Sequence, residues 1–140
     1  MCSTNVLKLL NKAKVEMTGL KNRILCIDDS QDSCELVDFV LNEAGYEVQL
    51  ANSLQDGLGL MQTSSFSVCL LDMSLPDGSG IDLIPKLLSV DPLLQIIVCS
   101  GDARPEIYEE VTEAGAVAFF TKPIDFDLLV ARVTSCLTPN

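Results

Sequence analysis

The chain has 140 residues, of which 48% are hydrophobic, and a formal net charge of −11 at pH 7. This length suits one domain with a substantial core. No apolar run reaches the roughly 18 residues of a membrane span, and the N-terminus lacks the continuous apolar segment of a secretory signal, so we expect no membrane contact and a cytoplasmic location. A body this acidic repels nucleic acid, which argues against direct DNA or RNA binding without a further domain.

Histidine is absent, and the six cysteines form no Cys-x-x-Cys pair. Without histidine the chain has no Ser-His or Cys-His nucleophile pair, and phosphohistidine chemistry would need a histidine from another protein. Cys26, Cys69 and Cys99 lie inside apolar, strand-like runs. Buried free cysteine behaves as a small hydrophobe, so these residues are expected to pack in the core.

Residues 1–22 are expected to form a separate N-terminal element. Residues 5–17 show the spacing of an amphipathic helix, and more than half of the nine lysines and arginines lie in residues 1–23, against the single acid Glu16. Such a helix could dock on the acidic body, pair with a partner helix or belong to a linker. The sequence does not choose among these three uses.

From Arg23 onward, short apolar runs alternate with helical patterns. We expect strands at 23–27, 46–51, 68–71, 95–99 and 118–121. The helices between and after them are expected from Ser30 to Gly45, at 54–61, around 81–88, from Pro105 to Gly115, and at 126–137. Gly57 and Gly59 weaken the second of these helices by about 1 kcal/mol each.

Capping and turn residues support these boundaries. Ser30 is a plausible N-cap and Gly45 a stop for the first helix, whose apolar stripe includes Leu36 and Leu41. The segment 76–78, Pro-Asp-Gly, predicts a turn after the third strand. Five strand-helix units in strict alternation, with strands apolar on both faces, predict an α/β fold: a doubly wound, five-stranded parallel sheet with helices on both faces.

Polar side chains follow four of the predicted strands at the point where each strand ends. Asp28 and Asp29 follow the first strand, Asp72 the third, Ser100 the fourth and Lys122 the fifth. The carboxyl ends of parallel strands meet at one edge of an open α/β sheet, where ligands bind. These five side chains are therefore expected to converge.

Three carboxylates at one point repel one another and stay ionised only if a cation lies among them. Oxygen ligands of this kind suit Mg²⁺, which keeps waters for an incoming phosphate. A carboxylate is also a competent phosphoryl acceptor. The Lys122 ammonium and the Ser100 hydroxyl could supply the counter-charges that in-line phosphoryl transfer needs.

The ordered set Asp28-Asp29, Leu-Asp-Met-x-Leu-Pro-x-x-x-Gly over 71–80, Ser100-Gly101 and Lys122-Pro123 resembles the receiver domain of two-component response regulators. The resemblance runs from about Arg23 to Leu137, and we expect a receiver domain over residues 23–138. It implies a CheY-like (flavodoxin-like) sheet in the strand order 2-1-3-4-5.

By this resemblance Asp72 would be the phosphoacceptor, with Asp29, Asp72 and the main-chain carbonyl of Ser74 as Mg²⁺ ligands and Asp28 acting through a water. Ser100 would be the switch hydroxyl, and Phe119, three residues before Lys122, the aromatic switch residue. Lys122 would bridge phosphate and carboxylate. The Lys122-Pro123 bond would resemble the cis-proline turn frequent in the family.

The resemblance implies a phosphorelay protein and not an enzyme with a separate substrate: the chain would catalyse only its own phosphoryl transfer and slow dephosphorylation. The donor would be a histidine kinase or a histidine phosphotransfer protein. Phosphorylation would change the affinity of the face built from the fourth helix, fifth strand and fifth helix for a downstream protein. Only residues 138–140 follow Leu137, so we expect either a stand-alone relay or a piece of a larger regulator or hybrid kinase.

The sequence departs from the family pattern before the last strand. Residues 116–118, Ala-Val-Ala, replace the acids that some regulators pair with basic residues such as Arg132, so that kind of salt-bridged dimer is not expected. The fourth helix instead carries an acidic outer face that favours a basic partner, formed by Glu106, Glu109, Glu110 and Glu113.

Each motif also has a purely structural explanation when taken alone: Lys122 as a solvated lysine, Phe119 as a core residue, Asp28 and Asp29 as acids near a helix start. Together these explanations would need five coincidences in chain order. Two other functions stay open. A Mg²⁺-dependent phosphatase is disfavoured because no Asp-x-Asp motif is present, and a non-phosphorylated scaffold with a receiver fold is disfavoured because all the required side chains are intact.

Overall fold

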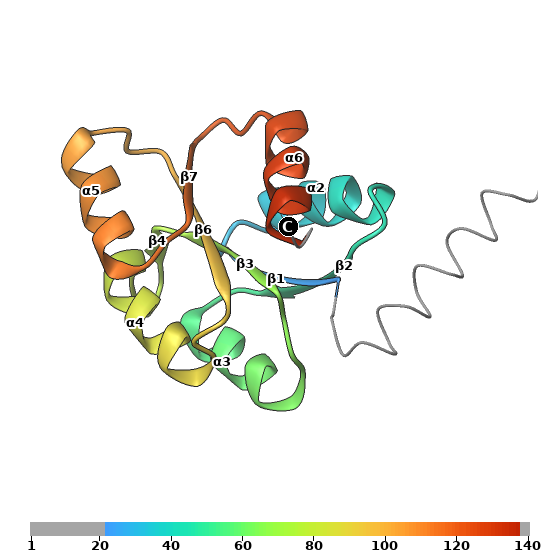
Figure 1. Cartoon of the computed structure of the whole chain (residues 1–140), viewed down its shortest axis with the longest axis horizontal. Helices are drawn as coiled ribbons and strands as arrows, with labels where there is room; N and C mark the ends of the chain where they lie inside the picture. The colour runs from blue at the N-terminus through green and yellow to red at the C-terminus, as the bar shows by residue number, and fades with distance from the viewer. Residues whose placement is uncertain (1–21, 138–140) are drawn as a thin grey trace, which may run out of the picture.

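The computed structural model describes residues 22–137. Its main sheet has five parallel strands in the order β2-β1-β3-β6-β7 (Figure 1). Their bounds are β1 (Arg23–Ile27), β2 (Glu47–Ala51), β3 (Val68–Asp72), β6 (Gln95–Ser100) and β7 (Ala118–Thr121). Since two short strands, β4 (Ser74–Leu75) and β5 (Gly78–Ser79), fall outside this sheet, the order corresponds to 2-1-3-4-5 among the five main strands. The predicted doubly wound fold is confirmed.

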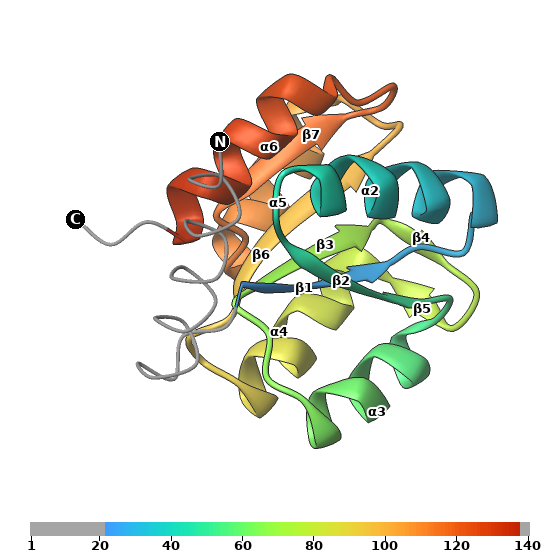
Figure 2. The ribbon, with the colours of Figure 1, turned by 90° about the vertical axis from the view of Figure 1, so that its right-hand side faces the viewer.

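Within residues 22–137, five helices pack on the sheet. Figures 1 and 2 show that they cover both of its faces. On one face lie α2 (Gln31–Glu43) and α6 (Phe126–Leu137). On the other lie α3 (Leu54–Thr63), α4 (Gly80–Val90) and α5 (Pro105–Ala114). The amphipathic helix predicted at 5–17 lies outside the described residues. Within 22–137, no helix is long and apolar enough to cross a membrane.

The alternation of side chains along the central strands divides the core in two. In β3, Leu70 packs with the cluster under α2 and α6, while its neighbour Leu71 packs with the cluster under α3, α4 and α5. All five residues of β3 are buried. This strand therefore fixes the position of Asp72, its last residue, from both sides.

The two edge strands differ from the expectation that every strand is apolar and buried on both faces. β2 is mostly half-buried, and its first residue, Glu47, is exposed and pairs with Arg23 at 2.8 Å. β7 is also half-buried. Each of these strands has a neighbour on one side only, so its far edge meets solvent.

The first helix starts where the sequence predicts, but one residue of its predicted apolar stripe is exposed. Ser30 caps α2 by accepting a hydrogen bond from the backbone N–H of Ser33. Cys34, Val37 and Leu41 form the buried stripe, whereas Leu36, expected on it, is 48% exposed. Leu36 lies two residues from Cys34, about 200° around the helix, and so cannot share its face.

The predicted turn at 76–78 is the tip of a small antiparallel hairpin, β4 (Ser74–Leu75) and β5 (Gly78–Ser79). The carboxylate of Asp77 in this turn accepts hydrogen bonds from the backbone N–H groups of Leu54 and Gln55, at 3.0 and 3.1 Å. The hairpin that follows Asp72 is therefore fastened to the start of α3.

Candidate functional site

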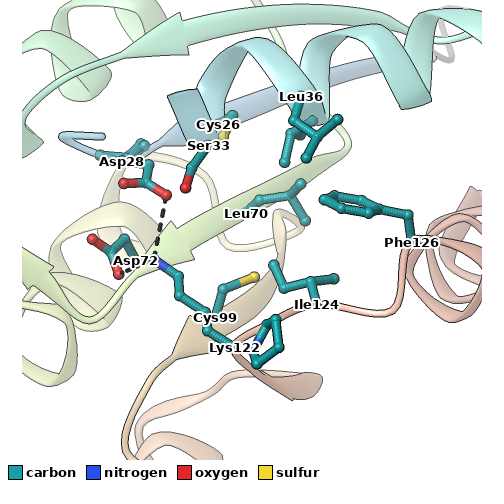
Figure 3. Close-up of a pocket in the computed structure, with 13 residues that line it drawn as sticks. Cys26, Asp28, Ser33, Leu36, Leu70, Asp72, Cys99, Lys122, Ile124 and Phe126 are labelled. Atoms are coloured by element: carbon teal, nitrogen blue, oxygen red, sulfur yellow. Dashed lines mark hydrogen bonds and ion pairs between the residues drawn. The ribbon is translucent and has the colours of Figure 1, made fainter. Parts of the chain in front are cut away.

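The structure brings the predicted charged residues Asp28, Asp72 and Lys122 together at the carboxyl edge of the sheet (Figure 3). Asp28 directly follows β1, Asp72 ends β3, Ser100 ends β6, and Lys122 directly follows β7. The ammonium of Lys122 reaches Asp72 Oδ1 at 3.1 Å and Asp28 Oδ2 at 3.5 Å. Three strands thus contribute charged groups to one cluster, as the sequence predicts.

Asp72, like Asp28, is buried, with only 7% of the residue exposed. Burial raises the pKa of its carboxyl. The hydrogen bond from Lys122 opposes that rise, the charge of Asp28 adds to it, and a backbone hydrogen bond from Ser74 again opposes it. Burial and the neighbouring acid outweigh the stabilising contacts, so the ionised carboxylate is held in an environment that disfavours its charge.

Lys122 is oriented by its backbone as well as by its ion pairs. Its N–H donates to the carbonyl of Ser100 at 2.8 Å, and the Lys122-Pro123 peptide bond is cis. Burial lowers the pKa of the Lys122 ammonium, but its contacts with Asp72 and Asp28 outweigh burial and raise it. Burial is the main cause of the raised pKa of Asp72, whereas the contacts with the two carboxylates raise the pKa of Lys122.

The acids form a group that fits a divalent cation. Asp28, Asp29 and Asp72 each offer a carboxylate oxygen, and these oxygens all lie within 4.8 Å of one another. Asp28 is held in place by the backbone N–H of Ser30, which donates to Asp28 Oδ1 at 2.9 Å, while Asp29 is exposed. Clustered carboxylate oxygens with an open side are the donor set that Mg²⁺ prefers.

The two predicted switch residues lie in the last two strands of the sheet: Ser100 ends β6, and Phe119 lies in β7, three residues before Lys122. Ser100 is buried, and its hydroxyl accepts a hydrogen bond from the backbone N–H of Asp102 at 3.0 Å. Phe119, in β7, is half-buried, and its ring meets that of Tyr108 edge to face, with centroids 6.0 Å apart. Tyr108 lies on α5 and is 55% exposed, so Phe119 contacts a residue of the outer surface.

Two residues that support the site were missed by sequence reasoning. The thiol of Cys34 donates to the carbonyl of Asp28 at 3.2 Å, and Asp77 fastens the hairpin after Asp72 to α3. Cys34 lies four residues after the N-cap Ser30, on the face that the helix period turns toward the sheet. That spacing was the available signal for Cys34, whereas the contact of Asp77 depends on tertiary structure.

Comparison with known proteins decides the family. The profile described as "Response regulator receiver domain" matches residues 24–134, most of the chain. The chain belongs to this family. Among solved structures, a CheY-like receiver domain protein from Methanospirillum hungatei is similar, with 30% identity and a TM-score of 0.78 over 82% of this chain and 92% of that one. The beryllofluoride-activated DrrB receiver domain shows 29% identity and a TM-score of 0.75, over 82% and 96% of the two chains.

Curated relatives are longer than this receiver. The response regulator PilR of Pseudomonas aeruginosa is 29% identical over 84% of the chain, and the transcriptional regulatory protein ZraR of Salmonella typhimurium is 30% identical over 81%. In both cases the match spans only 26% of the relative. The similarity therefore concerns the receiver portion of these regulators.

Proposed function

We propose that the chain accepts a phosphoryl group on Asp72 from the phosphohistidine of a partner, in a reaction that depends on Mg²⁺. The observation that carries this proposal is the position of Asp72 itself. Its carboxylate lies at the end of the central strand, 3.1 Å from the Lys122 ammonium and with an oxygen within 4.8 Å of those of Asp28 and Asp29. The proposed nucleophile Asp72 therefore lies beside a positive charge, that of Lys122, and beside acids that can bind a cation.

In the proposed transfer, an Asp72 carboxylate oxygen attacks phosphorus, forming the P–O bond as the bond from phosphorus to the donor nitrogen breaks. The other ring nitrogen of the phosphohistidine carries a proton, so a neutral imidazole leaves with the donor protein. Asp29, Asp72 and the main-chain carbonyl of Ser74 would hold Mg²⁺, with Asp28 acting through a water, and the ion when bound neutralises charge on the phosphoryl oxygens. Lys122 supplies a second positive charge beside Asp72.

After transfer, the Ser100 hydroxyl turns toward the phosphoryl group, giving up its hydrogen bond with the Asp102 N–H. Phe119 then moves inward and away from Tyr108. This changes the face built from α5, β7 and α6, the surface that a downstream protein would read. The four glutamates 106, 109, 110 and 113 on α5 favour a basic partner for this face.

The proposed phosphoryl donor is a histidine kinase or a histidine phosphotransfer protein. The proposed output partner is a downstream protein that binds the phosphorylated form. We propose a cytoplasmic domain over residues 23–138 that touches neither membrane nor nucleic acid itself. Catalysis is limited to its own phosphorylation and slow dephosphorylation. Transcriptional regulators among the relatives suggest that nucleic-acid binding, where it occurs, belongs to segments outside the receiver.

Incubation with Mg²⁺ and acetyl phosphate, followed by intact mass spectrometry, tests the proposal. A receiver gains one base-labile phosphoryl group and loses it slowly after the donor is removed. A phosphatase would release inorganic phosphate continuously without a stable adduct, and a scaffold would do neither. Glu113→Gln, an exposed acid distant in sequence from the motifs, serves as the control variant and should be phosphorylated like the parent.

A further inference from the structure

A cavity of about 280 Å³ opens beside Asp72, on the side of the sheet that α2 and α6 cover. Figure 3 shows that its lining is divided into a polar and an apolar part. The polar part consists of Asp28, Asp72, Lys122 and Ser33. The apolar part comes chiefly from Leu36, Val37, Leu70, Cys99, Ile124 and Phe126.

The apolar part is built from elements that cannot simply collapse into the space. Leu70 and Cys99 are fixed in adjacent strands of the sheet and are buried, while Leu36 stands at the open side. An apolar molecule entering here would remove apolar surface from water, which favours binding. The sulfurs of Cys99 and Cys26 also line the cavity and favour contact with an aromatic ring.

The polar part has an excess of negative charge. Two carboxylates, Asp28 and Asp72, face one ammonium, Lys122, and the third carboxylate, Asp29, lies within 4.8 Å of both acids. A molecule with an apolar body and a cationic head would place that head among the acids. A carboxylate head in the same position would meet repulsion from these acids.

We propose that this cavity is a binding site for small amphipathic amines, with the ammonium beside Asp28 and Asp72 and the apolar body against Leu70 and Cys99. The amine head and Mg²⁺ would use the same acids, so each would weaken binding of the other by the same factor. One consequence rests on the proposed function: an amine in the cavity would slow phosphorylation of Asp72. The binding itself does not depend on phosphorylation.

Methyl NMR of the parent protein, labelled at Ile, Leu and Val and kept in EDTA, tests the site with tryptamine as the probe. We expect saturable shifts with a dissociation constant of about 1 mM or tighter. The shifts should be largest at Leu70, Val37 and Ile124 and absent at Ile84 and Leu87, which pack on the opposite face of the sheet. Indole-3-acetate, with the same ring and a negative head, should bind about tenfold more weakly.

Leu36→Trp and Phe39→Trp provide a matched pair on α2. Both side chains are exposed, by 48% and 64%, so neither substitution disturbs the core, but only Leu36 lines the cavity. The larger ring at position 36 should block the open side and abolish the tryptamine shifts. The same ring at position 39 should leave them unchanged.

The proposal is overturned if tryptamine gives no saturable shift, if Leu36→Trp binds it like the parent, or if indole-3-acetate binds equally well. Addition of Mg²⁺ to the tryptamine complex provides a further check, since it should raise the apparent dissociation constant. An unchanged constant would contradict the placement of the amine head. Because these readouts do not involve phosphorylation, failure of the binding site and failure of the proposed phosphoacceptor function would be seen separately.

Discussion

The ammonium of Lys122 donates a hydrogen bond to the carboxylate of Asp72 at 3.1 Å, although 50 residues separate them in the sequence. The pairing arises because β3 and β7 end at the same edge of the sheet, with β6 between them. Placed beside the proposed nucleophile, Lys122 is positioned to interact with a phosphoryl group on Asp72. Its charge should therefore matter more in the transition state than in the resting protein.

Lys122→Met is accordingly expected to slow phosphorylation of Asp72 by acetyl phosphate by about 100-fold, a typical cost for loss of one preorganised charge. The measurement is the rate of phosphoprotein formation by intact mass at saturating Mg²⁺. Lys86→Met, which removes a lysine from the exposed side of α4, is the control and should react like the parent. Equal rates for all three proteins would exclude Lys122 from the transfer.

Asp72→Asn is expected to raise the melting temperature by a few degrees at neutral pH in EDTA. The folded-state pKa of the Asp72 carboxyl is raised by burial, which the Lys122 contact only partly offsets. The parent should therefore lose stability as pH rises from the unfolded-state pKa, about 3.9, through the raised folded-state pKa. Above that window the ionised carboxylate costs stability, and the asparagine removes this cost.

Thermal melts of both proteins over a pH series check this prediction. Their melting temperatures should approach each other in acid and separate as the pH becomes neutral. Addition of Mg²⁺ should stabilise the parent more than the variant, because the variant lacks one of the three carboxylates. A variant that melts below the parent in EDTA at neutral pH would show that the Asp72 charge stabilises the fold.

Asp77→Ala is expected to destabilise the protein at neutral pH, and Asp77→Asn to do so less, because asparagine retains one acceptor oxygen. The N–H groups of Leu54 and Gln55 lower the pKa of the Asp77 carboxyl. A lowered folded-state pKa means that this contribution is fully present above the unfolded-state pKa of about 3.9 and is lost as pH falls through the folded-state value.

Amide NMR gives a direct readout of this contact. The amide shifts of Leu54 and Gln55 should titrate with a midpoint below about 3.9, and this titration should be absent in Asp77→Asn. A midpoint at or above that of a free aspartate would contradict the capping role.

Gly57→Ala and Gly59→Ala are expected to change stability in opposite directions, although both lie in α3. A Cβ at position 57 would lie 2.6 Å from Cδ1 of Ile27, whereas a Cβ at position 59 would meet nothing within 4 Å. Gly57→Ala should cost about 1–3 kcal/mol through overpacking. Gly59→Ala should gain about 0.5–1 kcal/mol through the better helix propensity of alanine. Urea unfolding measures both, and two changes of the same sign would refute the packing argument.

These two glycines also show where sequence reasoning reaches its limit. From the sequence, both glycines are expected to destabilise the helix by the same free energy, because intrinsic helix propensity depends on the residue type and not on its neighbours in the fold. Only the fold shows that Gly57 faces Ile27 and that Gly59 faces solvent. Leu36 is a similar case: it is apolar and close to the helix stripe, yet it is largely exposed beside the cavity.

The fold and the convergence of the charged residues were predictable for a different reason. Asp28, Asp72, Ser100 and Lys122 each follow an apolar run, and the geometry of parallel strands brings such positions to one edge. The contacts of Asp77 with α3 and of Cys34 with the Asp28 carbonyl depend on loop paths and helix rotation, which local sequence does not specify. The hairpin β4–β5 could not be predicted either, since its sequence indicates a turn but not the antiparallel pairing of the two short strands.

The most direct test of the proposed function identifies the residue that carries the phosphoryl group. The parent is treated with acetyl phosphate and Mg²⁺, the acyl phosphate is trapped by borohydride reduction, and the modified residue is identified by peptide mass spectrometry. Asp28→Asn and Asp29→Asn should retain Asp72 as the modified residue at a reduced rate, and Asp72→Asn should remain unmodified. Modification of another residue in the parent, or an Asp72→Asn variant labelled as fast as the parent, would contradict the assignment of Asp72 as the phosphoacceptor.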